Sequence, residues 1–214
     1  ATGAPVWARQ LGGLGRELPT GATTMPDGTV ALLGSFTSNA VTLSQGEADA
    51  VTLTGSANGN SFVCRYDADG APVWSTHIEH GAGAFLNLGG IAAFEDGSIC
   101  IAGFGPEAVT VDPGGSSEAT LRSFDRFDLL MVRYDAAGAL DWARRDGGMG
   151  TIARLEGVAA YPDGSFGVAG GFQSSFTVDH GGPGETTYAG YSGMSPGTDT
   201  LLVRYNADGS HDGR

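Results

Sequence analysis

Apolar side chains occur along this chain in short runs that glycine, aspartate and proline interrupt. Residues 98–104 (SICIAGF) and 129–135 (LLMVRYD) are typical of these runs, which are rich in β-branched and aromatic side chains. Asp-Gly or Ala-Gly pairs follow many of them. This pattern indicates β-strands joined by tight hairpin turns. It predicts an all-β protein, and no apolar run approaches the ~18 residues that a membrane span needs.

The runs belong to a unit of about 68 residues that occurs three times. Tryptophans recur at intervals of 67 and 68 residues, at Trp7, Trp74 and Trp142. An Asp-Gly turn and an Arg-Tyr pair recur at nearly the same interval, at Asp27, Asp96 and Asp163 and at Arg65, Arg133 and Arg204. We therefore expect one domain of residues 1–214, with repeats at about 1–70, 71–138 and 139–209.

Each unit contains four strand candidates. The first strand is predicted at 21–25, 90–94 and 157–161, and the second at 29–36, 98–104 and 165–172. The third is predicted at 61–67, 129–135 and 200–206, and the fourth at 6–11, 73–78 and 141–146. Small residues dominate the first strand, which suits strands that crowd around a common axis. Four strands in a repeated unit are typical of β-propeller blades.

The units resemble the bacterial β-propeller repeats built around F-V-x-[KR]-Y-D-x-x-G-x-x-x-W and a later G-[IV]-A-x-x-x-D-G. The matching residues are Phe62, Val63, Arg65, Tyr66, Asp67, Gly70, Trp74, Gly90, Ile91, Ala92, Asp96 and Gly97. The resemblance covers nearly the whole chain except the long segments. It implies a propeller domain of a secreted or surface-exposed bacterial protein. It supplies no catalytic motif, so no catalytic residue is assigned.

After its last turn the third unit has no fourth strand with a tryptophan, whereas residues 5–11 (PVWARQL) have the sequence of such a strand. Propellers usually have four to eight blades, and closure removes exposed strand edges. We therefore expect two copies to form a six-bladed homodimer, in which each N-terminal strand completes the other copy's last blade. Trp7, Arg204 and Tyr205 would lie at this closure. The alternative is a longer array of which this chain is a part.

The composition of the chain disfavours some classes of partner and of chemistry. The net charge is −13 and the isoelectric point about 4.4, which disfavours nucleic acid and anionic membrane surfaces as partners. The chain has no lysine, so chemistry that needs a lysine amine is excluded. Cys64 and Cys100 occupy places that small apolar residues hold in other units, so we expect both to be buried free thiols. No signal peptide is visible within the chain.

The candidate ligand site lies at the end of the units opposite the tight turns. Long segments that differ between units gather there, and variable loops on a rigid scaffold commonly carry function. The candidate ligand residues near the axis, on the connections that lead to the first strands, are Arg16, Glu17, Asn87, Arg154 and Glu156. Arginines among carboxylates suit a carboxylate or sugar ligand. The alternative is a rim of solvated charges.

A weak calcium alternative rests on two acidic pairs with equal spacing, Asp112 with Glu118 and Asp179 with Glu185. An acidic solvated turn explains them better, because calcium sites need six or more oxygen ligands. No metal or cofactor is otherwise expected. The sequence thus predicts a non-enzymatic binding or scaffold module that takes a small-molecule, glycan or protein ligand. The alternatives are a glycan-active hydrolase or lyase and a purely structural spacer.

Overall fold

The computed structural model describes residues 3–56, 59–81, 86–105, 108–124, 128–148, 154–191 and 198–213. These residues form β-strands and turns, and the described part of the chain contains no helix. The predicted all-β class is therefore confirmed. No helix in these ranges has the length and apolar character needed to cross a membrane.

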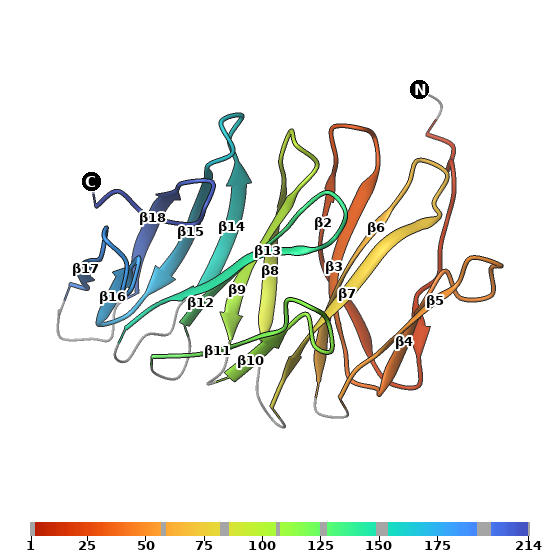
Figure 1. Cartoon of the computed structure of the whole chain (residues 1–214), viewed down its shortest axis with the longest axis horizontal. Coiled ribbons are helices and arrows are strands. Elements are labelled where there is room, and N and C mark those ends of the chain that lie inside the picture. Colours follow the sequence, from red (N-terminus) through yellow and green to blue (C-terminus); the bar gives the residue numbers. More distant parts are fainter. Residues whose placement is uncertain are drawn as a thin grey trace.

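The described strands form five antiparallel sheets, and the three that contain the main strands of the sequence repeats stand side by side (Figure 1). We call them units 1 to 3. Unit 1 contains β2 (Glu17–Thr24), β3 (Val30–Phe36), β6 (Asn60–Tyr66) and β7 (Pro72–His80). Unit 2 contains β8 (Asn87–Ala93), β9 (Ile99–Gly105), β12 (Asp128–Tyr134) and β13 (Leu140–Asp146). Unit 3 contains β14 (Arg154–Ala160), β15 (Phe166–Phe172) and β18 (Asp199–Tyr205).

The first strands β2, β8 and β14 are neighbours in space, each at one edge of its unit. The predicted crowding of these strands is visible at two glycines. A Cβ atom on Gly21 would lie 3.0 Å from Ile91 of the next unit, and one on Gly90 would lie 2.5 Å from Val158. Side chains at these two positions would push neighbouring units apart.

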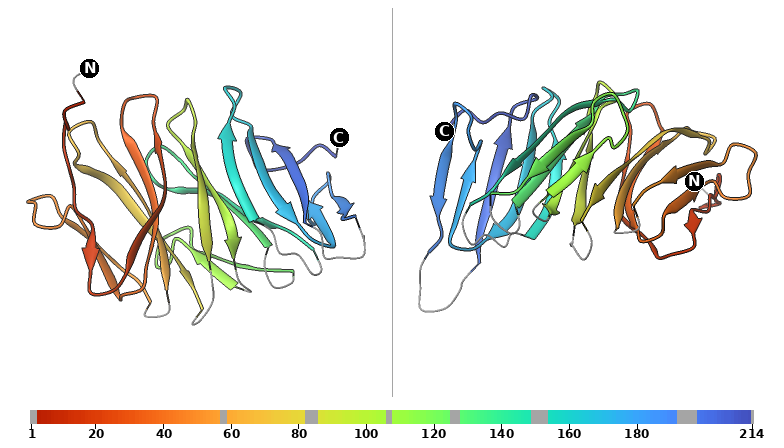
Figure 2. Two further views of the ribbon diagram at one scale, coloured as in Figure 1. Left: turned by 180° about the vertical axis from the view of Figure 1, so that it is seen from behind. Right: turned by 60° about the horizontal axis from the view of Figure 1, so that its bottom comes forward.

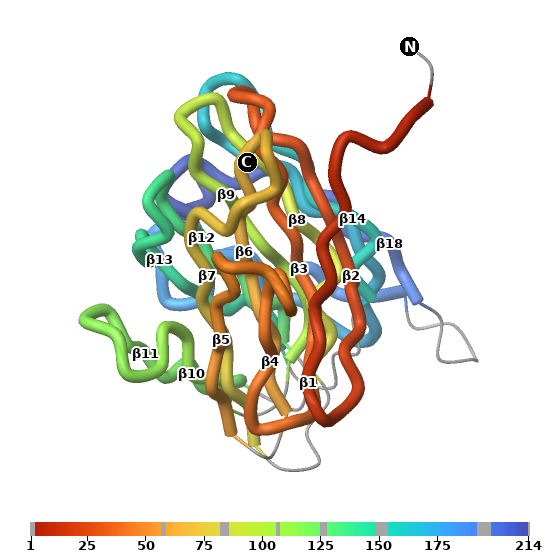
Figure 3. Tube along the Cα trace, turned by 90° about the vertical axis from the view of Figure 1, so that its right-hand side faces the viewer, coloured from red at the N-terminus to blue at the C-terminus, as the bar shows by residue number. Residues whose placement is uncertain are grey.

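The prediction of a strand at residues 6–11 is wrong for the single chain. In the described structure these residues pair with no strand, and only β1 (Gly12–Gly13) pairs, with β4 (Ala40–Leu43). The physical reason is that a strand needs a neighbour that pairs along its length, whereas in the described structure residues 6–11 receive a single backbone hydrogen bond, from the Gln45 N–H to the Gln10 carbonyl (2.8 Å). The segment runs instead along the front of unit 1, meaning the side that faces away from unit 2, where it is red in Figure 3.

Each long segment between the second and third strands forms an accessory hairpin. The hairpins are β4 with β5 (Val51–Thr54), β10 (Ala108–Val111) with β11 (Ala119–Arg122), and β16 (Ser175–Val178) with β17 (Thr186–Ala189). Each hairpin reaches back to the segment that precedes its unit (Figure 2): β10 pairs with β7, β4 with β1, and Thr177 with Gly147. Backbone pairing therefore joins neighbouring units, in addition to side-chain packing.

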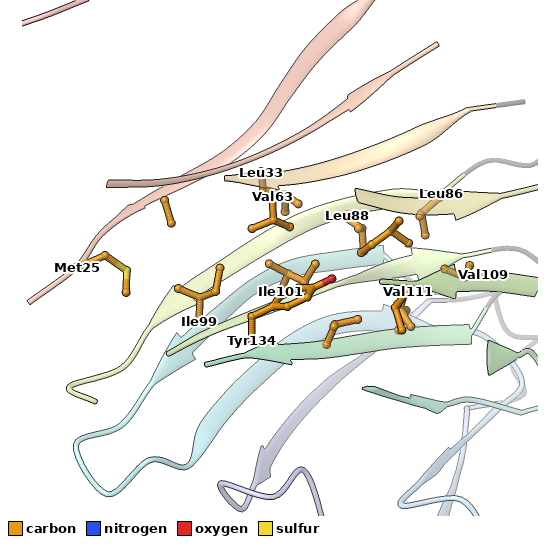
Figure 4. Packing of buried hydrophobic residues seen from close by; sticks show 14 residues of the cluster. Met25, Leu33, Val63, Leu86, Leu88, Ile99, Ile101, Val109, Val111 and Tyr134 are labelled. Atoms are coloured by element: carbon orange, nitrogen blue, oxygen red, sulfur yellow. The ribbon is translucent and has the colours of Figure 1, made fainter. Parts of the chain in front are cut away.

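The apolar core lies between the units. The faces of units 1 and 2 meet around Leu33, Val63, Ile101 and Tyr134 (Figure 4). A second cluster lies between units 2 and 3, and a third covers the front of unit 1 beneath Trp7 and Leu11. Burial of these faces is the main stabilising term of the fold.

Both cysteines are free and fully buried, as expected from the sequence. Cys64 lies on β6 and Cys100 on β9, in different units. Burial raises the pKa of each thiol to about 12, so both remain protonated at neutral pH. Protonated, inaccessible thiols are poor nucleophiles, which argues for a packing role.

Candidate functional site

The tight turns of all three units lie at one end of the molecule, and the long segments lie at the other (Figure 1). The sequence-predicted ligand residues belong to the long-segment end. Arg16 immediately precedes β2, while Glu17, Asn87 and Arg154 begin β2, β8 and β14. They are therefore placed at the same end of three neighbouring first strands.

A β-bulge interrupts each of these strands near that end. The pairing register shifts between Pro19 and Gly21, between Leu88 and Gly90, and between Leu155 and Gly157. Glu156 is the extra residue in unit 3, and Thr20 and Gly89 take its place in units 1 and 2. Bulges redirect side chains and are frequent beside binding sites.

The five candidate residues do not form one hydrogen-bonded cluster in the described chain. Arg154 lies 3.8 Å from Glu156, with side chains 81% and 65% exposed. No hydrogen bond or ion pair within the described ranges joins this pair to Arg16, Glu17 or Asn87. Such an exposed ion pair contributes ~0–1 kcal/mol to stability, so its charges remain available to a ligand.

A hollow of about 370 Å³ lies beside Arg16 and was not predicted from the sequence. Residues 14–15 and 37–40 line it. Thr37 closes one side, because its hydroxyl accepts a hydrogen bond from the Arg16 N–H (3.0 Å) and its own N–H donates to the Arg16 carbonyl (3.2 Å). The polar run Thr37-Ser38-Asn39 directly after β3 was the available signal.

The carboxylates of the acidic pairs already accept hydrogen bonds from backbone N–H groups within the turns of the accessory hairpins. The Asp112 carboxylate accepts from the Ser117 N–H (3.2 Å), and the Glu118 carboxylate from the Gly114 N–H (2.6 Å). Asp179 and Glu185 accept in the same way from Gly184 and Gly181. Their equal spacing thus has a structural explanation, because two similar turns require acceptors at the same places.

We expect calcium to leave the stability of the protein unchanged. The four carboxylates of these pairs already bind backbone N–H groups, and an ion would have to displace those bonds. Melting curves recorded in EDTA and in millimolar calcium chloride should therefore coincide. A higher melting temperature in calcium would show that the ion binds the folded state and would favour the calcium alternative.

The repeated arginine of the third strand forms a junction between units, a role that the sequence did not reveal. The Arg65 side chain donates to the Thr29 hydroxyl (2.9 Å), pairs with Asp27 in the turn of its own unit, and donates to the Ala136 carbonyl of unit 2 (2.9 Å). Charge-assisted bonds of this kind are among the stronger ones in proteins. We call this arrangement the arginine clamp.

Unit 2 repeats the arginine clamp. Arg133 donates to Ser98 (2.8 Å) and Asp96 (3.0 Å) of its own unit, and to the Ala207 carbonyl of unit 3 (3.0 Å). Burial tends to raise the pKa of Asp96, but hydrogen bonds from Ser98 and the charge of Arg133 outweigh it and lower the pKa. The clamp therefore keeps this carboxylate ionised.

Tryptophans of the fourth strands complete the junctions. Trp74 lies against Gly138 of unit 2, and Trp142 against Gly209 of unit 3. The Trp142 indole N–H also donates to the Ala207 carbonyl (3.0 Å). Trp7 behaves in the same way toward unit 1, because it lies against Gly70 and its N–H donates to the Ala68 carbonyl (3.0 Å).

The residues expected at ring closure lie in different places. Trp7 covers the front of unit 1, and Arg204 lies on the opposite side of the molecule, on the outer side of unit 3. The Tyr205 side chain packs on Phe166 of its own unit, and its hydroxyl donates to Asp146 of unit 2 (2.7 Å). The side chain of Tyr205 is thus already used within the chain, and only its backbone is available for closure.

The chain matches no protein-family model and no curated protein.

Proposed function

We propose that the chain is a non-enzymatic β-propeller module in which units 1 and 2 are complete blades and unit 3 is a blade without its fourth strand. The observation that carries this proposal is the junction between units. An arginine clamp, a tryptophan on a turn glycine and a crowded pair of first strands recur at both internal junctions. Repetition of one junction geometry is how propeller blades are arranged around an axis.

The proposed module closes as a six-bladed ring made by two copies of the chain. Residues 5–11 of one copy would supply the fourth strand of unit 3 in the other. The position of Trp7 supports this, since it contacts unit 1 as Trp74 contacts unit 2 and Trp142 contacts unit 3. Closure would pair both free strand edges, which otherwise invite aggregation.

In this proposal the long-segment end binds a glycan, small molecule or protein. The exposed Arg154–Glu156 pair and the hollow beside Arg16 support that choice. Following the resemblance of the repeats, the module belongs to a secreted or surface-exposed bacterial protein. Its net charge of −13 repels the phosphates of nucleic acid and so disfavours such a ligand.

The hydrolase alternative requires two carboxyl groups ~5–10 Å apart across a cleft, one of them held protonated. The rim carboxylates Glu17 and Glu156 belong to β2 and β14, with β8 between those strands. The carboxyl groups with a shifted pKa have it lowered, and they lie in the tight turns at the opposite end: Asp27, Asp96, Asp163 and Asp208. A binding role therefore has more support than hydrolysis.

A glycan-array screen of the intact protein, with and without calcium, tests the ligand proposal. We expect a sugar that carries a carboxylate to bind, and Arg154→Ala to reduce its signal about tenfold because one charged hydrogen bond is lost. Arg122→Ala is the matched control, since Arg122 is an exposed arginine on an accessory hairpin. A signal that Arg154→Ala leaves intact would move the site away from the rim. An array with no signal would favour the spacer alternative.

A further inference from the structure

The back of unit 3, meaning the side that faces away from unit 2, is uncovered. Leu202 on β18 takes the place of Val63 on β6 and Met131 on β12. Val63 and Met131 are fully buried, whereas Leu202 is 77% exposed. Among the described strands, β18 pairs with β15 alone, whereas β6 and β12 each lie between two strands. An exposed apolar face and a free strand edge therefore coincide.

Arg204 makes two of the three contacts that define an arginine clamp. It donates to the Ser165 hydroxyl (2.9 Å) and pairs with Asp163, as its counterparts do in units 1 and 2. In the described structure it reaches no carbonyl of a following unit. Its side chain is 55% exposed, compared with 9% for Arg65 and 6% for Arg133. The guanidinium lies over the Tyr161 ring (4.3 Å) and is thus held in place for a third partner.

The axial side of unit 3 is open in the same way. Gly157 is the counterpart of Gly21 and Gly90, which lie against Ile91 and Val158 of the next unit. A Cβ atom on Gly157 would meet no atom within 4 Å. The positions through which units 1 and 2 contact the following unit are therefore all present in unit 3, from its axis to its rim. In the described structure no following unit contacts them.

A groove of about 380 Å³ runs along this open side. Arg204, Leu202 and His211 are among the residues that line it. In units 1 and 2 the residues after the last turn continue as the fourth strand, but here they bend away. His211 is buried beside Gly184 of the accessory hairpin, and the Gly213 N–H donates to its Nδ1 atom (3.0 Å). The place of the fourth strand beside β18 is thus left free.

The front of unit 1 carries the complementary features. Trp7 and Arg9 anchor the N-terminal segment to the turn of unit 1, where Arg9 donates to the Gly70 carbonyl (2.7 Å). This leaves residues 5–11 next to unit 1 without a strand partner in the described chain. Ala68 holds the position of Ala136 and Ala207, the clamp acceptors, and Ala22 holds that of Ile91 and Val158.

We infer that the back of unit 3 docks onto the front of unit 1 of a second copy, with Arg204 donating to the Ala68 carbonyl of that copy. This inference rests on the proposed homodimer and adds its contact surface and register. Val203 lies opposite Ala8 of the second copy, as Cys64 lies opposite Ser75 and Val132 opposite Ala143. Gly157 receives Ala22 of the second copy at the axis. The second copy is the occupant because its front presents each feature that this face lacks.

Disulfide trapping tests the register. The variant Ala8→Cys/Val203→Cys is made with Cys64→Val and Cys100→Ala, since valine and alanine already hold the equivalent positions at Val132 and Ala31. Cysteine is tolerated at position 203 because Cys64 is its natural counterpart. Directly opposite residues on paired strands are close enough for a disulfide. Mild oxidation should yield a covalent dimer on non-reducing gels, which a reductant returns to single chains.

The matched control is Ala8→Cys/Leu202→Cys, because a shift of one residue turns the side chain to the other face of the strand. It should cross-link poorly. Mixing a chain with only Ala8→Cys and a chain with only Val203→Cys should restore the cross-link, which proves that it joins different copies. Arg204→Ala should weaken association about tenfold or more, while Arg122→Ala should not.

Light scattering on the unmodified protein separates the outcomes. A doubled mass without the cross-link from the matched pair would overturn this docking surface and leave the homodimer standing. The mass of a single chain would overturn both. A ladder of covalent oligomers larger than two would confirm the docking surface and contradict closure as a six-bladed ring.

Discussion

A chain that lacks residues 1–11 is expected to lose the homodimer and to aggregate. The deletion removes Trp7 and Leu11, which cover the third apolar cluster around Phe36, Phe62 and Tyr66. It also removes the segment proposed to pair with β18, so both the front of unit 1 and the edge of unit 3 would be bare. Exposed apolar faces and free strand edges promote association without a defined end.

Light scattering at micromolar concentration measures this effect directly. The intact chain should have twice the 21.7 kDa mass of one copy, and the shortened chain should give large, heterogeneous particles. Trp7→Phe is the milder control, because it keeps an aromatic ring over Tyr66 and Gly70. A shortened chain that remains a well-folded single copy, beside an intact chain of the same mass, would contradict the proposed closure.

Gly103→Ala is expected to lower the free energy of unfolding by about 3 kcal/mol, because the new methyl group would clash with backbone atoms. An ideal Cβ atom there would lie 2.1 Å from the Asn87 carbonyl oxygen and 2.6 Å from the Leu88 Cα atom. Both atoms belong to β8 just before its bulge. Backbone in a paired strand cannot move aside as a side chain can, so the two strands must separate.

Gly167→Ala is the matched control for this substitution. Gly167 lies on β15, at the position that Ala31 holds in unit 1, and a Cβ atom there would make only ordinary contacts with Tyr161 at 3.6 Å. Its effect should be about 0.5 kcal/mol or a slight stabilisation. Urea unfolding followed by tryptophan fluorescence gives both values. Equal midpoints for the two variants would show that the bulge accommodates a side chain.

The hairpins of the three units followed from local sequence. A turn such as Asp67–Gly70 requires glycine in the left-handed region, where Gly70 has φ of 82°, and an aspartate that accepts N–H bonds within the turn. Both requirements concern residues a few positions apart. The composition and length of the flanking apolar runs then located the strands, apart from shifts at their ends and the unpaired residues 6–11.

For the candidate ligand residues, the order of strands along the chain predicted only the end of the molecule at which they lie. Order along the chain places Asn87 and Arg154 at the same end as the long segments, and the structure agrees. Whether side chains meet depends on the bulges and on the spacing of the first strands. The hollow beside Arg16 and the pairing of Arg154 with Glu156 required that geometry.

By itself, the sequence determined the all-β class, the threefold repeat, the tight turns and the burial of Cys64 and Cys100. These features depend on side-chain pattern and on hydrogen bonds between near neighbours. Only the tertiary structure decided that Arg65 and Arg133 clamp the following unit, that each accessory hairpin reaches back to the preceding segment, and that the Tyr205 side chain faces unit 2. Those contacts join groups from different units, 71 and 74 residues apart for the two clamps, and local pattern does not specify which distant carbonyl or strand edge a side chain will meet.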